Sequence, residues 1–342
     1  MPPVSFFQNR LNTASKHKPL IVICAPTACG KTSCAEALFA QDSSSSFAGI
    51  AEVISADSMQ VYRGFNIGTA KPDKALLEKL PHHLIDICEM RGSFGAGDFV
   101  RKPLEAAADI YSRKKLPVIV GGTGFYIRNF IYGLPPTPQA DSLLRGQIEA
   151  RMKKEGAQKL WDELENLDPA SAHKIHIHDE YRIKRALEVC ITSGKPLSSF
   201  SVEPVPREGF SFLILSLQRS RAELYERIDK RVELMFEQGL ADEVRSLVSS
   251  GCCAEDSAMQ AIGYREFFTA DGRLNEDIQA VKERIKKDSR AYAKRQQTFF
   301  KAFTDAIPLN ADDMEGCEKK ITEFLAGAEN TLDSYAKFGH NI

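Results

Sequence analysis

One short stretch near the N-terminus, residues 20–32, constrains the fold of this chain more than any other. It reads Leu-Ile-Val-Ile-Cys-Ala-Pro-Thr-Ala-Cys-Gly-Lys-Thr. The five residues 20–24 predict a buried strand, and the next eight nearly match the phosphate-loop pattern of Gly, four residues and Gly-Lys-Ser/Thr. Helix-forming residues follow from Ser33 to Ala40. Strand, loop and helix in this order predict a phosphate-binding site, because loop N–H groups and a helix N-terminus converge on phosphate oxygens.

Individual loop residues have expected tasks. Lys31 adds a positive charge for the terminal phosphates, and Thr32 a hydroxyl that makes it the predicted ligand of Mg²⁺. Ala25 departs from the pattern, which has Gly there, but Ala is the next smallest side chain. The alternative is an ordinary turn that contains Gly-Lys-Thr by chance. The residues predicted to hold the phosphate groups are Ala25, Pro26, Thr27, Ala28, Cys29, Gly30, Lys31 and Thr32.

The overall composition is that of an ordinary globular protein. The chain has 342 residues, 43% of them hydrophobic and 27% charged, with a net charge of −1. This balance excludes a uniformly basic nucleic-acid coat but permits a local basic face. The eight cysteines have no paired C-x-x-C spacing, which favours a reducing cytoplasm over a disulfide framework. We expect residues 1–18 to be an extension of little structure, with neither a signal peptide nor a membrane span.

Polar residues follow two further predicted strands. Asp57 and Ser58 come after a strand at Glu52–Ser55, and Thr123 follows a strand at Pro117–Val120. Carboxyl ends of strands in open α/β sheets gather the catalytic groups, so Asp57 is expected beside the phosphate loop. The alternative for Asp57, a helix N-cap, does not exclude this role. The second of these strands ends in Gly-Gly-Thr and lacks the Asp that holds Mg²⁺ in many hydrolases, so a nucleotide-hydrolysing motor is disfavoured.

A change of character between Gly133 and Pro206 predicts an inserted helical region. Prolines mark its start, and charged helical patterns without a clear strand follow. Strand character returns at Phe212–Leu217, so the insertion interrupts one domain and does not separate two. Arg221, beyond that strand, is expected to face the phosphate loop.

A long helix predicted at Asn275–Phe303 carries a local excess of positive charge. Two acids, Glu283 and Asp288, stand among the basic residues Lys282, Arg284, Lys286, Lys287, Arg290, Lys294, Arg295 and Lys301. A cationic face of this kind attracts a phosphodiester backbone with salt-sensitive affinity. A lysine-rich solvated helix is the alternative.

Seven stretches, in order, resemble the tRNA dimethylallyltransferases, also called tRNA isopentenyltransferases. They are the phosphate loop 25–32, ISADSMQVYR at 54–63, IGTAKP at 67–72, GGTGFY at 121–126, RALE at 185–188, QAIGYR at 260–265 and YAKRQ at 292–296. The resemblance covers about residues 20–300, and the ordered set is specific although each stretch alone is weak. Ala25 and Cys29, where Gly and Ser are usual, are its departures. Because no Cys/His finger follows the core, the bacterial form is the better match.

The resemblance implies an α/β fold with a phosphate-loop core, in which helices flank a parallel sheet, and an inserted all-helical domain. The expected division is 1–18 as extension, 19–134 with 207–325 as catalytic core, 135–206 as tRNA-binding insertion and 326–342 as tail. The implied reaction moves a dimethylallyl group from dimethylallyl diphosphate to N6 of an adenosine beside the anticodon of tRNA. The implied partners are tRNA, through its anticodon stem-loop, and dimethylallyl diphosphate, with Mg²⁺ as cofactor. We expect a cytoplasmic monomer.

Catalytic roles follow from this chemistry. The loop would hold a departing diphosphate, with Lys31, Mg²⁺ at Thr32 and Arg221 neutralising its charge. Asp57 is the expected general base for the adenine amine, and Thr123 would bind diphosphate or orient that amine.

The acceptor base must leave its stack to react. The segments that match RNA-contacting parts of the family are Asp57, Ser58, Met59, Gln60, Thr123, Arg145, Tyr181, Arg182, Ile183, Lys184, Arg185, Gln260, Ala261, Ile262, Gly263, Tyr264, Arg265, Lys294, Arg295 and Gln296.

Three other functions stay open at this point: a small-molecule kinase with the same core, an isopentenyltransferase acting on free AMP, ADP or ATP, and a non-catalytic RNA-binding protein that retains the loop.

Overall fold

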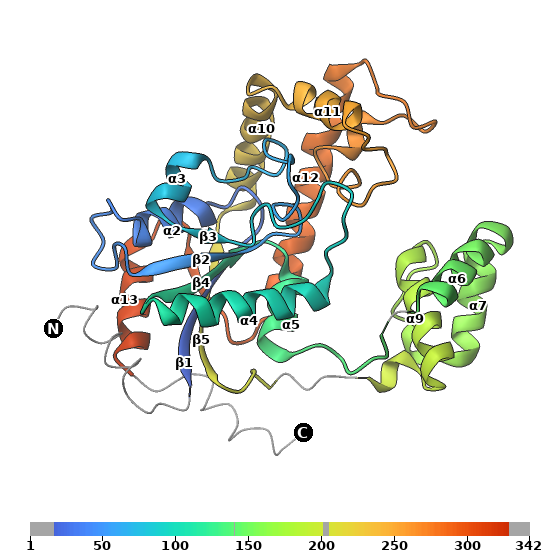
Figure 1. Cartoon of the computed structure of the whole chain (residues 1–342), viewed down its shortest axis with the longest axis horizontal. Helices are drawn as coiled ribbons and strands as arrows, with labels where there is room; N and C mark the ends of the chain where they lie inside the picture. The colour runs from blue at the N-terminus through green and yellow to red at the C-terminus, as the bar shows by residue number, and fades with distance from the viewer. Residues whose placement is uncertain (1–16, 140, 201–204, 328–342) are drawn as a thin grey trace. The chain divides into compact units, whose positions relative to one another are not determined.

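A six-stranded parallel sheet forms the centre of the larger part of the molecule (Figure 1). The computed structural model describes residues 17–139, 141–200 and 205–327. The strand order is β3-β2-β4-β1-β5-β6, and every pairing is parallel. The strands are β1 (Lys18–Cys24), β2 (Ala51–Ala56), β3 (His82–His83), β4 (Leu116–Gly121), β5 (Phe210–Gln218) and β6 (Ile307–Asn310). This architecture confirms the predicted α/β class.

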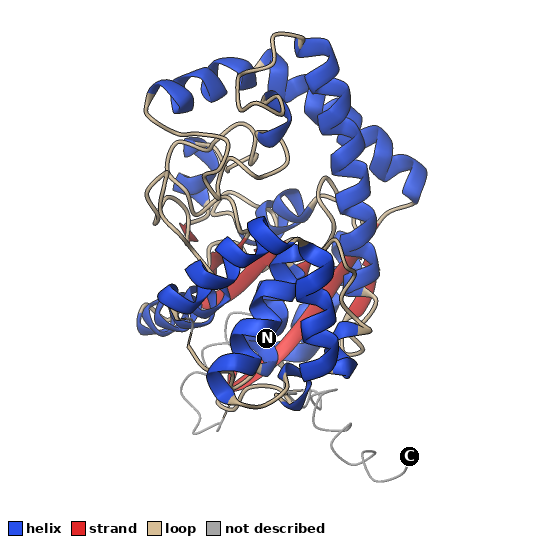
Figure 2. Cartoon of the chain, turned by 90° about the vertical axis from the view of Figure 1, so that its right-hand side faces the viewer, coloured by secondary structure: helices blue, strands red, loops and turns tan. Residues whose placement is uncertain are grey.

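Helices cover both faces of the sheet because its central strands are apolar on both sides (Figure 2). The α2 and α13 helices pack against alternate residues such as Ile21 and Leu215. On the opposite face, Phe130 of α5 contacts Phe212 of β5. The helices of this part are α2 (Lys31–Phe39), α3 (Lys74–Lys79), α4 (Ala96–Ser112), α5 (Gly124–Tyr132), α10 (Arg221–Glu237), α11 (Leu240–Ser249), α12 (Ile278–Phe300) and α13 (Met314–Leu325).

The register brings the carboxyl ends of three strands together. Gly121 of β4 lies level with both Cys24 of β1 and Ala56 of β2. A Cβ at Gly121 would collide with the Ala56 backbone, so only glycine permits this close approach. The loops that follow these strands therefore begin close together, and so do their first residues, Ala25 after β1 and Asp57 after β2.

A second core lies beyond the carboxyl edge of the sheet. Buried residues of α10, α11 and α12 pack there with the segment after β2, around Phe65, Tyr264 and Ile285. The ring of Tyr264 is fully buried and packs edge-on against Phe65, with 4.9 Å between centroids. This core carries the loops that lie opposite the phosphate loop.

The chain divides into two compact units, and Tyr132–Val205 forms the smaller one. It contains α6 (Ser142–Glu155), α7 (Ala157–Leu167), α8 (Pro169–Ala172) and α9 (Glu180–Ser193). Its own apolar core includes Ile148, Leu160 and Leu187. The predicted insertion boundaries were 135 and 206, and this region is helical as predicted.

Several predicted elements differ in extent from the observed ones. Strand β3 is limited to His82–His83, because Leu84 and Asp86 adopt positive φ angles that no strand accommodates. The α12 helix begins three residues after Asn275, at Ile278, where Asp277 caps its N-terminus. Strand β6 was not predicted. Most of the predicted extension 1–18 and tail 326–342 lies outside the described residues.

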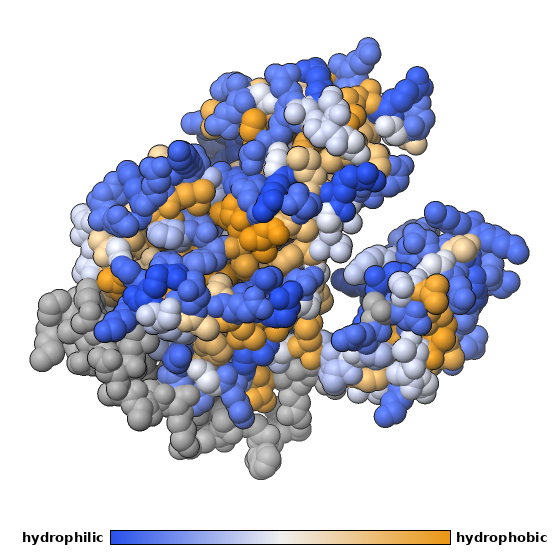
Figure 3. Space-filling view, viewed as in Figure 1, coloured by the Kyte–Doolittle hydropathy of each residue, from blue (hydrophilic) through white to orange (hydrophobic). Residues whose placement is uncertain are grey.

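The surface of the larger unit carries apolar residues in its middle, bordered by hydrophilic ones (Figure 3). Among the helices that the structure describes, none combines the length and the apolar character required to cross a bilayer.

Candidate active site

The phosphate loop turns tightly between β1 and α2. Ala28 and Gly30 adopt left-handed backbone conformations, with φ of 59° and 109°, which a small side chain and a glycine tolerate best. Lys31 Nζ donates to Ala25 O at 2.9 Å and Pro26 O at 2.8 Å. The lysine therefore lies inside the loop, with Thr32 exposed at the start of α2.

Burial changes the protonation of Lys31. Desolvation, together with the neighbouring Arg231, lowers the pKa of Lys31 to about 8, although Asp57 and two nearby cysteines act in the opposite direction. An anion placed in the loop would favour the charged form of this amine.

Arginines that follow β5 brace the loop from outside. Arg219 Nε donates to Cys29 O at 2.7 Å, and Arg227 Nε donates to Ala28 O at 2.9 Å. One turn further along α10, Arg231 donates to Thr27 Oγ1 at 3.4 Å. Sequence reasoning missed Arg231 and Arg227, although their spacing of four on one helix could have indicated a shared face.

The placement predicted for Arg221 is corrected by the structure. Its guanidinium lies 5.1 Å from the Tyr225 ring centroid, and its Nε donates to Tyr225 Oη at 3.1 Å. Arg221 is the first residue of α10, its exposed side chain contacts the residue one turn along that helix, and it does not line the cavity at the phosphate loop. The loop contact comes instead from Arg219, two residues earlier, whose side chain is buried.

Gln296 ties the loop to the end of β4. Its Oε1 accepts the Thr27 N–H at 2.8 Å, and its Nε2 donates to Gly122 O at 2.7 Å. The side chain is buried. This placement corrects the predicted RNA contact of Gln296, because both ends of its amide are engaged inside the protein.

Asp57 lies across from the loop in the turn after β2. Its Oδ1 accepts the N–H groups of Met59 at 2.8 Å and Gln60 at 3.4 Å, so this oxygen closes a turn; because no helix begins here, the alternative of a helix N-cap is wrong. Within the described part of the chain, Oδ2 has no hydrogen-bond partner. Thr123 Oγ1 accepts the Ser58 N–H at 3.1 Å, so Thr123 fixes the same turn.

Two cavities share Asp57 as part of their walls. One, of about 430 Å³, is cationic and opens on the phosphate loop, with Lys31, Thr32 and Arg227 in its lining. The other, of about 320 Å³, has an apolar side formed by residues of α10 and α12 such as Val232 and Ile285. The residues common to both are Thr27, Ala28, Asp57, Thr69, Arg231 and Tyr292.

The shared wall contains buried polar groups. Arg231 is surrounded by protein, and burial lowers its pKa while Asp57 partly restores it. Burial also raises the pKa of Tyr292 to about 12, with Asp57 acting in the same direction. A cation, a carboxylate and a neutral phenol therefore meet at the junction of the two cavities.

The residues predicted to contact RNA separate into exposed and buried groups. Ile183 and Tyr264 are fully buried and belong to the cores of their units, so direct RNA contact by these two side chains is wrong; helical periodicity turns Ile183 inward beside exposed neighbours. Gln260, Ala261, Ile262, Gly263, Arg265 and Arg295 line the apolar cavity with Ser58 and Met59.

In the smaller unit, Tyr181 is 79% exposed. Arg145, Lys184 and Arg185 line a cavity of about 210 Å³ beside it. Arg145 and Arg185 both pair with Glu188. Arg182 is exposed and pairs with Asp179.

The basic excess of α12 is partly neutralised by α10. Lys282 and Lys286 pair with Glu233, at 2.7 and 2.6 Å, and Arg290 pairs with Asp229. Lys294 and Arg295 are exposed further along the helix. The cationic surface is therefore narrower than the sequence indicated.

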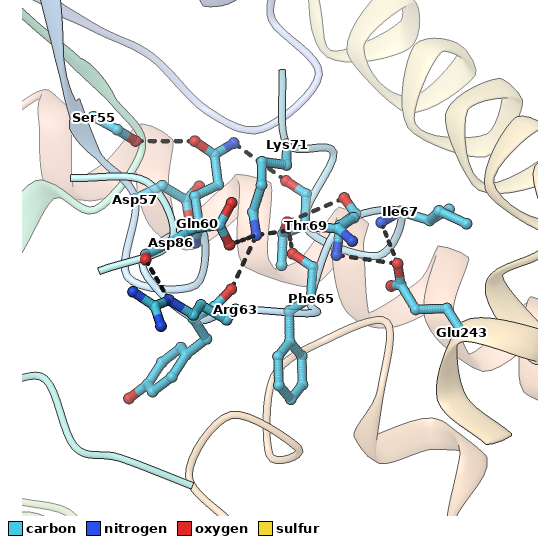
Figure 4. A network of polar contacts seen from close by, with 12 residues as sticks. Ser55, Asp57, Gln60, Arg63, Phe65, Ile67, Thr69, Lys71, Asp86 and Glu243 are labelled. Atoms are coloured by element: carbon cyan, nitrogen blue, oxygen red, sulfur yellow. Dashed lines mark hydrogen bonds and ion pairs between the residues drawn. The ribbon is translucent and has the colours of Figure 1, made fainter. Parts of the chain in front are cut away.

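A loop at residues 66–71 forms another wall of the two cavities, through Gly68, Thr69 and Ala70. Gln60 Nε2 donates to Thr69 O at 3.4 Å and Ala70 O at 3.3 Å (Figure 4). The arrangement as a whole can hold a phosphate-bearing group beside Lys31 and an apolar group with a nucleophile beside Asp57.

Comparison with known proteins gives one consistent result. The sequence profile of the IPP transferase family matches residues 60–303. A tRNA dimethylallyltransferase of Geobacter sulfurreducens is 41% identical over 294 residues, covering 85% of this chain and 91% of the relative. The tRNA dimethylallyltransferase 2 of Geotalea daltonii is 43% identical over 285 residues, covering 82% and 84%.

Solved structures agree. The full-length tRNA isopentenylpyrophosphate transferase of Bacillus halodurans aligns with a TM-score of 0.62 and 34% identity, over 94% of this chain and 99% of that one. A eukaryotic dimethylallyltransferase acting on tRNA aligns with a TM-score of 0.70 and 26% identity, over 93% and 80%.

Proposed function

Because this chain belongs to the IPP transferase family, we propose that it transfers a dimethylallyl group from dimethylallyl diphosphate to N6 of adenosine 37 in tRNA. The observation that carries the proposal is the position of Asp57 between a cationic and an apolar cavity. A reaction that separates an anionic leaving group from an apolar fragment needs both environments next to one base.

The diphosphate of the donor occupies the cationic cavity. Lys31, Arg227 and Arg231 neutralise the charge that grows as the allylic C–O bond breaks. Backbone N–H groups at the start of α2 add to this stabilisation. These groups replace the catalytic role first expected of Arg221.

Mg²⁺ fits the mouth of this cavity. The exposed Thr32 hydroxyl would supply a hard oxygen ligand for the ion beside the place of the diphosphate. The ion would supply further neutralisation of the leaving group.

Asp57 acts as general base on the acceptor. The N6 lone pair forms the new C–N bond as the C–O bond to diphosphate breaks, and Asp57 Oδ2 takes the N6 proton. Oδ1 stays bonded to the turn, so the carboxylate is oriented before the acceptor arrives. Thr123 acts through this turn and holds Ser58.

The tRNA is held by both units. In the smaller unit we assign RNA contact to Arg145, Tyr181, Arg182, Lys184 and Arg185, the exposed or partly exposed residues of the predicted set. In the larger unit Lys294 and Arg295 attract the backbone. We expect one chain to bind one anticodon stem-loop as a monomer.

Replacement of Asp57 by Asn tests the mechanism. Asn keeps an oxygen for the Met59 and Gln60 N–H groups but cannot take a proton, so we expect the transfer rate to fall by about 10²- to 10⁴-fold. Binding of tRNA and of dimethylallyl diphosphate should stay close to wild type. Asp73→Asn, which alters an exposed helix cap on α3, is the matched control and should keep full activity. An Asp57→Asn enzyme with unchanged turnover would eliminate Asp57 as the base.

Two other activities are separated by labelled substrates. Transfer of label from the γ-phosphate of ATP to a small acceptor, with none from dimethylallyl diphosphate to tRNA, would identify a kinase. Rapid prenylation of free AMP without a tRNA product would identify an isopentenyltransferase of free nucleotides.

A further inference from the structure

One carboxylate attaches the first half of the 66–71 loop to α11, whereas Thr69 and Lys71 hold the second half to neighbouring residues. Glu243 on α11 accepts hydrogen bonds from three consecutive backbone N–H groups (Figure 4). Its Oε2 lies 3.1 Å from Asn66 N and 2.8 Å from Ile67 N, and its Oε1 lies 3.3 Å from Gly68 N. Consecutive N–H groups converging on one point form an anion-binding concavity. The chain fills this concavity with its own side chain.

Tyr264 holds the same carboxylate from the other side. Its hydroxyl donates to Glu243 Oε1 at 2.7 Å. The ring lies under Gly68, where a Cβ would come within 2.5 Å of it. Loop, carboxylate and phenol are thus packed as one assembly, and the hydrogen bonds to a charged acceptor are of the stronger kind.

The loop in turn contacts the turn that carries Asp57. Gln60 donates to Thr69 O and Ala70 O and accepts from Ser55 Oγ at 2.9 Å. The backbone N–H of Gln60 donates to Asp57 Oδ1. Gly68 and Thr69 also line the apolar cavity beside Asp57. Glu243 is therefore connected to the base through three hydrogen-bonded links, from Glu243 to the loop, from the loop to Gln60 and from Gln60 to Asp57. It lines neither cavity described around Asp57.

We propose that Glu243 is a positioning residue for the acceptor: it fixes the cavity wall that faces Asp57 and thereby sets how the adenine meets the base. The inference rests on the proposed transfer to tRNA. Without the carboxylate, the N–H groups of residues 66–68 lose their partner and this part of the wall loses its attachment to α11, while Lys31, Arg227 and Arg231 keep their places. Replacement of Glu243 should therefore impair the reaction with tRNA and leave the binding of dimethylallyl diphosphate unchanged.

The experiment compares Glu243→Ala, Glu243→Gln and Glu243→Asp with Asp242→Asn. Asp242 is the adjacent residue on α11, and its carboxylate is 80% exposed in a surface pair with Arg245. For Glu243→Ala we expect kcat/KM for tRNA to fall at least tenfold, with KM for dimethylallyl diphosphate and Kd for inorganic diphosphate within twofold of wild type. Glu243→Asp should recover part of the loss and Glu243→Gln less, since Gln supplies one acceptor oxygen. Asp242→Asn should match wild type.

Chemical rescue distinguishes positioning from general loss of structure. Formate added to Glu243→Ala should restore activity toward tRNA at least threefold relative to chloride at equal ionic strength, because a small carboxylate can re-enter the concavity. Wild type and Glu243→Gln should not respond. The inference is overturned if Glu243→Ala keeps wild-type kcat/KM for tRNA, if diphosphate binding falls in parallel, or if formate has no effect. A wild-type enzyme that transfers nothing to tRNA would instead overturn the proposed function.

Discussion

Lys31 is the residue whose charge couples the loop to its ligand. In the free protein, burial lowers its pKa to about 8, whereas a bound diphosphate stabilises the ammonium and raises that pKa. Above pH 8 binding must therefore take up a proton. We expect the affinity for inorganic diphosphate to be insensitive to this group below pH 8 and to weaken by up to about tenfold per pH unit above it. Calorimetry in two buffers of different ionisation enthalpy measures the proton uptake.

Lys31→Met provides the control for this titration, because the pH dependence of its diphosphate binding no longer contains the Lys31 amine and reflects the protonation of diphosphate itself. Equal pH profiles for wild type and Lys31→Met would contradict the assignment. The sign for stability is opposite to that for binding. Between about pH 8, the pKa in the folded protein, and pH 10.5, the ordinary pKa, the folded state binds fewer protons than the unfolded state. The free energy of unfolding therefore increases with pH in this range, because the cost of burying the charged amine disappears.

Helices, strands and loops that depend on a pattern within one continuous stretch of sequence were predictable. The strand, loop and helix at residues 18–39 follow from local apolar and glycine patterns, and so does the position of Asp57 after β2. Arg231 was not predictable in the same way, since its role depends on how α10 packs against the loop. Strand β6 has only four residues, including a proline, and exists because it pairs with β5.

The charge of the α12 helix illustrates the same limit at the scale of an element. Its sequence indicates a broad cationic face, but Lys282, Lys286 and Arg290 are compensated by acids of α10. Arg295 is exposed, with its guanidinium 5.7 Å from the Tyr292 ring centroid. Acidic residues of α10, which are distant in sequence, therefore determine which basic residues of α12 remain unpaired and able to bind an anion.

For this element, we predict that Arg295→Ala weakens tRNA binding and lowers the slope of log affinity against log salt concentration by about 1, because one phosphate contact is lost. Diphosphate binding should be preserved. Arg290→Ala is the comparison, and its salt slope should change less, since Asp229 already neutralises that guanidinium. Filter binding of tRNA across a salt series measures both, and equal slopes for Arg295→Ala and wild type would contradict the prediction.

At the scale of the whole molecule, the smaller unit leaves and rejoins the larger one at adjacent points. Arg207 N donates to Ile131 O at 2.7 Å, so the flanking segments are held together within the larger unit. The smaller unit also has an apolar core of its own. A short Gly-Ser linker can therefore replace Tyr132–Val205 without stretching the chain, and the closure entropy of so short a loop is small.

We predict that this deletion leaves the phosphate-loop core folded, with diphosphate affinity within about threefold of the full chain, because Lys31, Arg227 and Arg231 all belong to the larger unit. Affinity for tRNA should fall by about tenfold or more, since Tyr181 and the arginines beside it are removed and each contact of this kind contributes about 1 kcal/mol or more. Equilibrium binding of both ligands to the full chain and the deletion tests the division. Loss of diphosphate binding would mean that the core depends on the smaller unit, whereas unchanged tRNA affinity would place RNA recognition entirely on the larger unit, around Arg295 and the cavity beside Asp57.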